Sequence, residues 1–438
     1  MTRKEKIKDF FRTSSPAVKT SLVIMGVGHL RYGSISKGIL YLLVEVSMIW
    51  YLIRRGFNDI EGFFTLGTQK ADAWAGIAGD NSIIMLLMGI FAWIVVGAFI
   101  YIYVQNVKGA REAQRRFEKA IPQKTLKENF RELLDRKFYC LALALPVIGV
   151  CIFNVLPIVF MILIAFTNYG GNTVPPELVD WVGLENFKKL IVLKKFGPTF
   201  IRILGWNLLW AVMSTVLNYF AGLGLALLLN KDCVRGKNFW RAFPILAYAV
   251  PGFITLLAFR FMFSYGGPIN QFIVAHGGFA IGFLDIDAKW SARIIGLLVN
   301  CWISVPSIML LATGNLSNRD MSIYEAADID GANRRQQFNK LTMPYMLFTT
   351  MPVLLSQFIG NFNNFGIFYF LRGGLYKDGY FLASDTDLLI NWLYNLSIDN
   401  NYYSIGAAIS LVIFIITSAI SLAVYVKSPS YREEDTFQ

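Results

Sequence analysis

The sequence predicts an all-helical integral membrane protein with about eight transmembrane helices, and three observations support this fold class. Hydrophobic residues make up 55% and charged residues 16% of the 438 residues, and the mean hydropathy is +0.48, which is too apolar for a soluble domain. Eight apolar stretches approach the ~20 residues that a helix needs to cross a bilayer. Lys and Arg concentrate in alternate connecting loops, as in other multi-pass proteins.

The spans are predicted from these apolar runs, taken in chain order. The first contains Glu45, the third contains two prolines, and the fourth contains Gly222, a small residue that lets helices approach closely. Before the first span, residues 22–30 are apolar but too short to cross, so we expect an interfacial or re-entrant segment there. The eight predicted spans cover about residues 38–53, 83–104, 138–166, 203–229, 242–263, 292–313, 345–370 and 403–426.

The distribution of basic residues predicts the orientation of the chain. One set of alternating segments holds 28 Lys and Arg residues, and the other set holds 10. Because cytoplasmic loops carry the excess of basic residues, both termini and the stretch 318–344 are expected in the cytoplasm. The basic run 105–137 is expected to contact membrane lipid at that surface. The net charge of +12 therefore does not indicate nucleic acid.

Cysteine and histidine usage argues against metal and redox sites. The four cysteines show no metal-ligand or redox spacing, and only His29 and His276 are present. A glycine-rich ATP-binding loop ending in Lys-Ser or Lys-Thr is also missing from the sequence. We therefore expect no metal and no cofactor in this chain, and no catalytic residues.

The polar stretch 318–344 lies between two apolar spans and is called the elbow below. Its residues Glu325, Ala326 and Ala327 favour helix, Gly331 permits a break, and Pro344 suits the first turn of a following helix. The pattern predicts a helix-turn-helix at the membrane surface. An ordinary interhelical loop is the alternative that periodicity alone leaves open.

The elbow also carries a spaced motif. Glu325-Ala326-Ala327 and Asp330-Gly331-Ala332, followed by Phe338 and by Leu-Thr-Met-Pro at 341–344, resemble the EAA signature of membrane subunits of ABC importers. The resemblance implies that Glu325, Ala326, Ala327, Asp330 and Gly331 couple this chain to a cytoplasmic ATPase. It also implies a type I importer permease fold, with a six-span core over 138–438 and two extra spans plus a cytoplasmic basic linker over 1–137.

Uncharged polar residues recur within the later spans. Asn300, Ser304 and Ser307 share one helical stripe, and Asn361 and Asn364 share another. Such residues commonly hydrogen-bond between helices, which is the structural alternative. Amides and hydroxyls beside aromatic rings also suit a neutral polyhydroxylated ligand. The few ionisable groups at depth, such as Glu45 and Arg260, are interpreted as structural or as reaching to the interface.

These spans carry a second resemblance. The runs Tyr248-Ala-Val-Pro251, Asn300-x-Trp302 with Pro306, and Asn361-Phe-Asn-Asn-Phe365 resemble the MalF-like family, the larger membrane subunits of maltose importers. In that family these spans build a sugar site near the middle of the membrane. Gly252 and Ser307 depart from the maltose pattern, which leaves the sugar open. By position, the site residues would be Tyr248, Gly252, Asn300, Ile303, Ser304, Ser307, Gly360, Asn361 and Asn364.

The function that follows from these resemblances is a membrane subunit of an ATP-driven importer for maltose, maltodextrin or a related oligosaccharide, in a prokaryotic inner membrane. It implies a second, homologous permease subunit as heterodimer partner, an ATPase homodimer that binds ATP and Mg²⁺, and an extracytoplasmic solute-binding protein.

Two alternatives remain. A permease for another solute, such as a glycerol phosphate or an amino acid, is one; a phosphate would need a basic residue such as Arg260 in the cavity. A lipid-linked glycosyltransferase is the other, and it would need catalytic acids. Asp385 and Asp387 are acids of the predicted external loops and can equally be interpreted as solvated loop residues.

Overall fold

A computed structural model describes residues 12–427 of the chain, except 73, 124, 137 and 232. This described part is helical, with isolated β-bridges and no strand. The all-helical class is therefore confirmed. The chain divides into two compact units, residues 1–182 and 183–438, each with its own internal packing. The predicted functional boundary at 137/138 falls inside the first unit, and that boundary stays a prediction.

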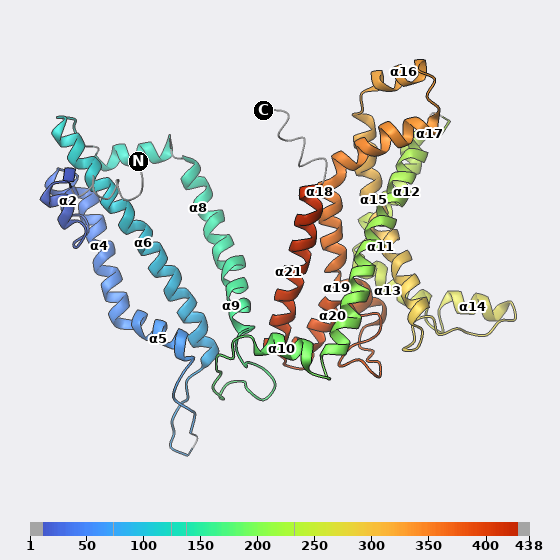
Figure 1. Cartoon of the computed structure of the whole chain (residues 1–438), viewed down its shortest axis with the longest axis horizontal. Helices are drawn as coiled ribbons and strands as arrows, with labels where there is room; N and C mark the ends of the chain where they lie inside the picture. The colour runs from blue at the N-terminus through green and yellow to red at the C-terminus, as the bar shows by residue number, and fades with distance from the viewer. Residues whose placement is uncertain (1–11, 73, 124, 137, 232, 428–438) are drawn as a thin grey trace. The chain divides into compact units, whose positions relative to one another are not determined.

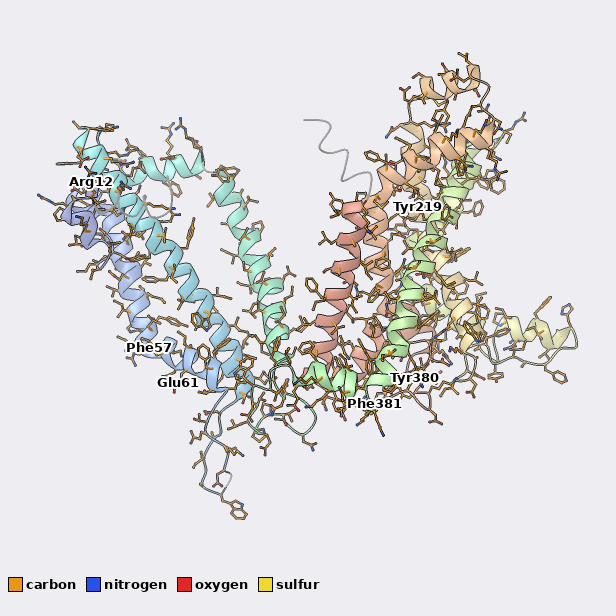
Figure 2. All side chains as sticks on the ribbon, viewed as in Figure 1. Arg12, Phe57, Glu61, Tyr219, Tyr380 and Phe381 are labelled. Atoms are coloured by element: carbon orange, nitrogen blue, oxygen red, sulfur yellow. The ribbon has the colours of Figure 1, made fainter. Side chains whose placement is uncertain are left out.

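The first unit is built around two long helices, α4 and α6 (Figure 1). The shorter helix α5 lies between them in the chain and packs against α6. The elements are α2 (Pro16–Thr20), α3 (Val27–Arg31), α4 (Ile35–Tyr51), the π-helix η1 (Leu52–Gly56), α5 (Phe57–Thr65), α6 (Ser82–Glu118), α7 (Leu126–Leu134), α8 (Phe138–Val150), the π-helix η2 (Cys151–Val155) and α9 (Leu156–Ile164). Figure 2 places Phe57 and Glu61 on α5.

Side chains from α4 and α6 hold the short apolar segment that precedes α4. Glu45 Oε2 accepts a hydrogen bond from the backbone N–H of Met25 at 2.8 Å, and Asn106 Oδ1 accepts one from Gly26 at 3.0 Å. Buried backbone N–H groups need such acceptors because no water reaches them. Glu45 therefore has a structural role, as the sequence interpretation held.

The second unit surrounds the long helix α11, which packs against α15 and α18 (Figure 1). Its elements are α10 (Glu185–Val192), α11 (Gly197–Asn230), α12 (Lys237–Ala249), α13 (Gly252–Met262), α14 (Pro268–Ala275), α15 (Lys289–Ser317), α16 (Met321–Ile329), α17 (Arg334–Gln337), the π-helix η3 (Phe338–Thr342), α18 (Met343–Phe362), α19 (Phe365–Arg372), α20 (Leu389–Tyr394), the π-helix η4 (Asn395–Asp399) and α21 (Tyr403–Lys427).

Two apolar clusters stabilise this unit along α11. Trp210 and Phe368 pack with their ring centroids 4.9 Å apart in the cluster away from the elbow. Tyr219, which Figure 2 places nearer the elbow, packs in the other cluster with residues of α15 and α18. At Gly222 a Cβ atom would lie 2.6 Å from the side chain of Ile308. Only glycine permits this approach of α11 to α15.

The predicted spans compare with the observed helices as follows. Six helical segments in the described chain are long and apolar enough to cross a bilayer: Ile35–Thr65, Ser82–Glu118, Leu141–Ile164, Gly197–Asn230, Lys289–Ser317 and Tyr403–Lys427. The predicted fifth span is two helices, α12 and α13, bent by 92° where Pro251 disfavours helix for the preceding residue. The predicted seventh span is broken between α18 and α19. The count of eight spans stays a prediction.

A buried ion pair fixes the loops at the end of the second unit opposite the elbow. Arg372 Nη1 donates to Asp385 Oδ1 at 2.8 Å and to Thr386 Oγ1 at 2.9 Å, and Arg372 Nε donates to Leu284 O at 3.1 Å. Lys377 Nζ donates to the second oxygen of Asp385 at 2.8 Å. Burial acts to raise the pKa of Asp385, but the hydrogen bonds from Lys377 and Arg372 outweigh it and keep the pKa below the ordinary value.

The expectation that Asp385 is a solvated loop residue was therefore wrong. Only 3% of the residue is exposed, and both carboxylate oxygens are occupied by cations. A carboxylate at this depth needs such partners, since an unpaired buried charge is very costly. The carboxylate is thus committed to structure and not available for glycosyl transfer.

Removing one partner of this pair should destabilise the second unit. We expect Arg372→Met to lower the free energy of unfolding by about 3–5 kcal/mol because it leaves the Asp385 carboxylate buried and without one of its two cations. The measurement is the thermal midpoint of the purified protein, together with its abundance in membranes.

Arg202→Met is the matched control. Arg202 is exposed and donates to the same loop through Gly379 O at 3.1 Å, so its loss should cost less than about 1 kcal/mol. Equal midpoints for the two variants would contradict the structural role of the buried pair.

Candidate functional site

A cavity of about 360 Å³ lies among α13, α15, α18 and α19, and it is called the amide cavity below. Seven of the nine residues predicted for the sugar site line it, although they come from four separate helices or helix ends. None of the lining residues is charged. The seven are Gly252, Asn300, Ile303, Ser304, Gly360, Asn361 and Asn364.

Three asparagine side chains form a hydrogen-bonded chain in the wall of the cavity. Asn364 Nδ2 donates to Asn300 Oδ1 at 3.3 Å, and Asn300 Nδ2 donates to Asn361 Oδ1 at 3.4 Å. The chain ends on α11, where Asn361 Nδ2 donates to Thr215 Oγ1 at 3.0 Å. The first two distances are long for N–H···O bonds, whose usual value is about 2.9–3.0 Å. These amides can therefore exchange partners with a polar ligand at small cost.

The break between α18 and α19 creates the geometry of this wall. Asn364 is the N-cap of α19, since its Oδ1 accepts from the backbone N–H of Ile367 at 3.2 Å. The carbonyls that the break leaves without helical partners are satisfied by α11. Trp210 Nε1 donates to Asn361 O at 3.1 Å, and Asn207 Nδ2 donates to Phe362 O at 3.0 Å.

Two predicted residues do not line the amide cavity. Tyr248 lies near the end of α12, 57% exposed, because the bend at Pro251 separates α12 from α13. Ser307 turns back on its own helix, where its Oγ donates to Ser304 O at 2.8 Å. The helical spacing placed both residues correctly on their elements, but spacing carries no information on a bend in the neighbouring segment.

Several lining residues were missed from sequence. Gln357 is the most informative, because its Oε1 is buried and has no hydrogen-bond partner among the described residues. A buried acceptor without a partner is costly unless a ligand or water satisfies it. Its spacing of i, i+4 and i+7 with Asn361 and Asn364 was the signal that could have identified it. Phe253 and Phe370 add aromatic rings to the same wall.

The elbow forms a helix, a turn and a second helix, as its pattern predicted. The helix α16 ends in a Schellman motif: Ala332 N–H donates to Ala327 O at 2.9 Å, and Gly331 N–H donates to Asp328 O at 3.1 Å. Gly331 has φ +78°, a left-handed conformation that other residues adopt only with strain. A Cβ at Gly331 would meet no atom within 4 Å, so the requirement for glycine is conformational.

The elbow holds together as one body while leaving its motif residues open. Gln337 Nε2 donates to Asp328 Oδ1 and to Ala332 O, and the hydroxyls of Tyr324 and Thr342 lie 3.0 Å apart. These contacts join α16 to α17 and η3. Of the five motif residues predicted to couple, Ala327 is half-buried, and the exposed ones are Glu325, Ala326, Asp330 and Gly331. Ile329 beside them is 87% exposed.

The chemistry that these side chains offer is recognition of a neutral ligand. Within the described part of the chain, no group of three or more His, Cys, Asp or Glu residues could hold a metal ion. The amide cavity supplies amide donors and acceptors, a serine hydroxyl and aromatic rings. Amides match the paired donors and acceptors of hydroxyl groups, and rings cover apolar C–H faces.

Comparison with known proteins identifies the family. Residues 219–428 match the family described as "Binding-protein-dependent transport system inner membrane component". The chain is 32% identical over 424 residues to the maltodextrin transport system permease protein MalC of Streptococcus pneumoniae. The aligned region covers 94% of this chain and 96% of that protein. It is also 32% identical over 418 residues to the galactooligosaccharides transport system permease protein GanP of Bacillus subtilis, covering 94% and 97%.

A solved structure supports the fold. The crystal structure of a bacterial ABC transporter involved in the import of alginate superposes with a TM-score of 0.56 at 22% identity, covering 69% of this chain and 98% of that chain. The resemblance inferred from the elbow and from the Asn-rich run is confirmed by the sequence relatives. The chain is thus a multi-pass membrane transport component rather than an enzyme, and it belongs to the family of binding-protein-dependent transport system inner membrane components.

Proposed function

We propose that this chain is the permease subunit of an ABC importer that carries maltose or maltodextrin into the cytoplasm, and that the amide cavity binds the sugar. The observation that carries the proposal is the uncharged cavity in which three asparagines and the unsatisfied Gln357 converge. The name of the pneumococcal relative supports a maltodextrin, and that of the Bacillus subtilis relative supports a galacto-oligosaccharide as the second candidate.

An anionic solute fits this cavity poorly. A phosphate or carboxylate requires Arg or Lys among the lining residues, and the amide cavity has neither. Arg260 lines a different cavity, closer to the end opposite the elbow. The glycerol phosphate alternative therefore loses the residue on which it depended.

The elbow is proposed to transmit motion from the ATPase. It connects α15, which carries Asn300 and Ser304, with α18, which carries Asn361. A displacement of the elbow therefore reaches two walls of the amide cavity through continuous helices. In the proposed cycle, ATP-driven closure of the ATPase dimer moves the elbow and turns the cavity from the cytoplasm to the outside.

The remaining parts of the machine belong to other chains in this proposal. They are a second homologous permease, an ATPase homodimer that binds ATP and Mg²⁺, and an external solute-binding protein. The excess of Lys and Arg in alternate loops supports an orientation with both termini and the elbow in the cytoplasm. In that orientation the exposed motif residues of α16 face the ATPase.

Replacing amides of the cavity should impair uptake without loss of the protein. We expect Asn361→Ala and Gln357→Ala each to raise the KM for maltodextrin uptake by roughly tenfold or more, because each removes a hydrogen bond to the sugar. Uptake of labelled maltodextrin by cells that carry the complete transporter is the measurement, normalised to abundance in the membrane.

Asn363→Ala is the matched control for these variants. Asn363 lies in the same Asn-rich run but lines a different cavity, beside α21, and its Nδ2 donates to Ile359 O on its own helix. Its removal should leave KM within about twofold. Normal kinetics in both cavity variants would overturn the assignment of the sugar site.

Substitution in the elbow should separate ATP hydrolysis from transport. We expect Gly331→Val to reduce uptake at least about tenfold, because a β-branched residue is strained at φ +78° and the Schellman turn shifts. Gly331→Asn is the control, since asparagine tolerates this conformation far better. The readouts are uptake and the ATPase activity of the assembled complex.

Assembly and residual ATPase activity should persist in Gly331→Val while transport falls. If Gly331→Val transports as well as the unmodified complex, the elbow does not couple through this turn. If Gly331→Asn fails to the same degree as Gly331→Val, the side-chain surface matters and the backbone conformation does not.

A further inference from the structure

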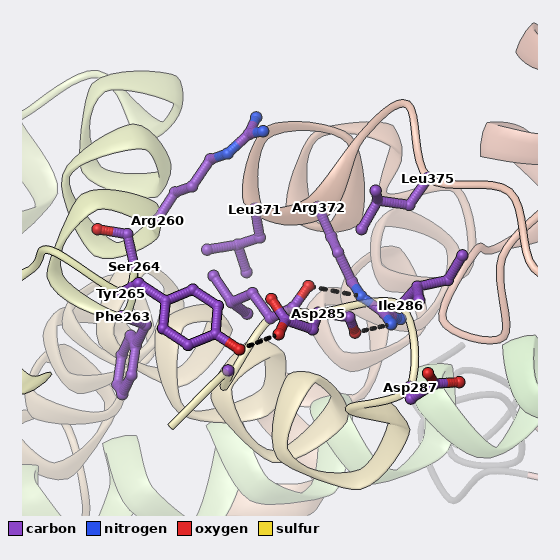
Figure 3. A pocket seen from close by; sticks show the side chains of 12 residues that line it. Arg260, Phe263, Ser264, Tyr265, Asp285, Ile286, Asp287, Leu371, Arg372 and Leu375 are labelled. Carbon is purple, nitrogen blue, oxygen red and sulfur yellow. Dashed lines mark hydrogen bonds between the residues drawn. The ribbon is translucent and has the colours of Figure 1, made fainter. Parts of the chain in front are cut away.

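A second cavity, of about 610 Å³, lies at the end of α13 that points away from the elbow, and it is called the distal cavity below (Figure 3). Unlike the amide cavity, it is lined by charged side chains and a tyrosine. Its polar lining residues are Arg260, Ser264, Tyr265, Asp285, Asp287 and Arg372. Neither the sequence motifs nor the proposed sugar site uses this cavity.

The two cavities follow one another along the same pair of helices. On α13, Gly252 and Leu256 line the amide cavity and Arg260 lines the distal one, at successive spacings of four residues on one face. On α19, Phe370 lines the amide cavity, and the next two residues line the distal one. The rise of a helix puts Gly252 and Arg260 about 12 Å apart along the axis.

One wall of the distal cavity is rigid. The guanidinium of Arg372 donates hydrogen bonds to Asp385, to Thr386 and to the backbone carbonyls of Leu284 and Asp285. These bonds fix the loop that carries Asp285 and Asp287 relative to α19. A fixed wall lowers the entropy that binding would otherwise cost.

Tyr265 and Arg260, which also line the cavity, are held by hydrogen bonds within the chain but stay exposed. Tyr265 OH donates to Asp285 Oδ2 at 2.6 Å, as the dashed line in Figure 3 shows, while the residue stays 58% exposed. The hydrogen bond to Asp285 and the charge of that carboxylate raise the pKa of Tyr265, so the hydroxyl stays protonated near neutral pH. Arg260, also exposed, has one hydrogen bond within the described chain, a long one of 3.5 Å to Phe370 O.

The charges around this cavity nearly cancel, since Lys377 Nζ also lies 3.6 Å from Asp287 Oδ1, and they favour a neutral ligand with several hydroxyl groups. Asp285 and Asp287 place two carboxylates in the same cavity as Arg260, and the charge of Arg372 is compensated by Asp385. Carboxylates accept from hydroxyls, a guanidinium donates to them, and an exposed ring covers a sugar face.

The amide cavity alone is small for a long oligosaccharide. At about 360 Å³ the amide cavity lies near the small end of ligand pockets, which span ~300–1,000 Å³, so an extended oligosaccharide exceeds it. We propose that the distal cavity is a second saccharide subsite, which binds the trailing sugar residues of a long oligosaccharide while its leading end occupies the amide cavity. This inference rests on the proposed sugar transport.

The test compares two chain lengths in cells that carry the complete transporter. We expect Arg260→Gln to raise the KM for labelled maltohexaose by roughly tenfold and to leave the KM for labelled maltose within about twofold, because only the longer sugar reaches Arg260. Tyr265→Ala, which removes the exposed ring, should show the same dependence on chain length. Membrane abundance of each variant is measured alongside.

Lys188→Gln is the matched control, since Lys188 is an exposed cation on α10, at the same end of the unit, and lies outside the cavity. It should change neither KM. Equal KM increases for both sugars in Arg260→Gln and Tyr265→Ala, as a defect in docking the binding protein would produce, overturn the distal subsite. So does the absence of any change.

A wrong assignment of the proposed function would give a different experimental result from a wrong assignment of the distal subsite. If the unmodified transporter takes up neither maltose nor maltohexaose, the maltodextrin assignment is wrong, and the distal subsite falls with it. If Asn361→Ala impairs both sugars equally while Arg260→Gln impairs neither, the sugar site stands and only the distal subsite is overturned.

Discussion

The second unit depends on the satisfaction of backbone groups where α18 gives way to α19. Within a bilayer no water pairs with free carbonyls, so a broken helix survives only where side chains replace the missing bonds. Trp210 and Asn207, both on α11, supply those bonds to the carbonyls of Asn361 and Phe362. Both donors are fully buried, and their helix is the one on which α15 and α18 pack. The fold and the break therefore stabilise each other.

This arrangement explains how polar side chains can face a cavity among apolar spans. Because Trp210 and Asn207 satisfy the carbonyls at the break, the side-chain amides of Asn361 and Asn364 are left to bond to Asn300, while Asn364 Oδ1 also caps α19. Buried amides tolerate no loss of partners, but they exchange one partner for another readily when the bonds are long. A sugar hydroxyl can replace the amide contacts at 3.3–3.4 Å without leaving an amide unpaired.

Much of the site was predictable because helical spacing survives in the folded chain. Asn300 with Ser304 lines the amide cavity because the two share a stripe of α15, whereas Asn361 and Asn364 line it from the two sides of the break between α18 and α19. Tyr248 does not line the amide cavity, because the predicted fifth span is two helices bent by 92°, which hydropathy cannot distinguish from a straight span. The pairing of Arg372 with Asp385 was also beyond prediction, since it joins a helix end to a loop whose path is set by tertiary packing.

Hydrogen bonds also fix the shape of the elbow. The contacts of Gln337 with Asp328 and of Tyr324 with Thr342 close the elbow across its own turn. At the turn itself, the Schellman hydrogen bonds set the backbone, and no side chain lies against Gly331. Beyond the elbow, α18 runs from Met343 without interruption to the Asn361 network. The elbow, α18 and the break held by α11 thus connect the exposed face of α16 to the amides of the cavity.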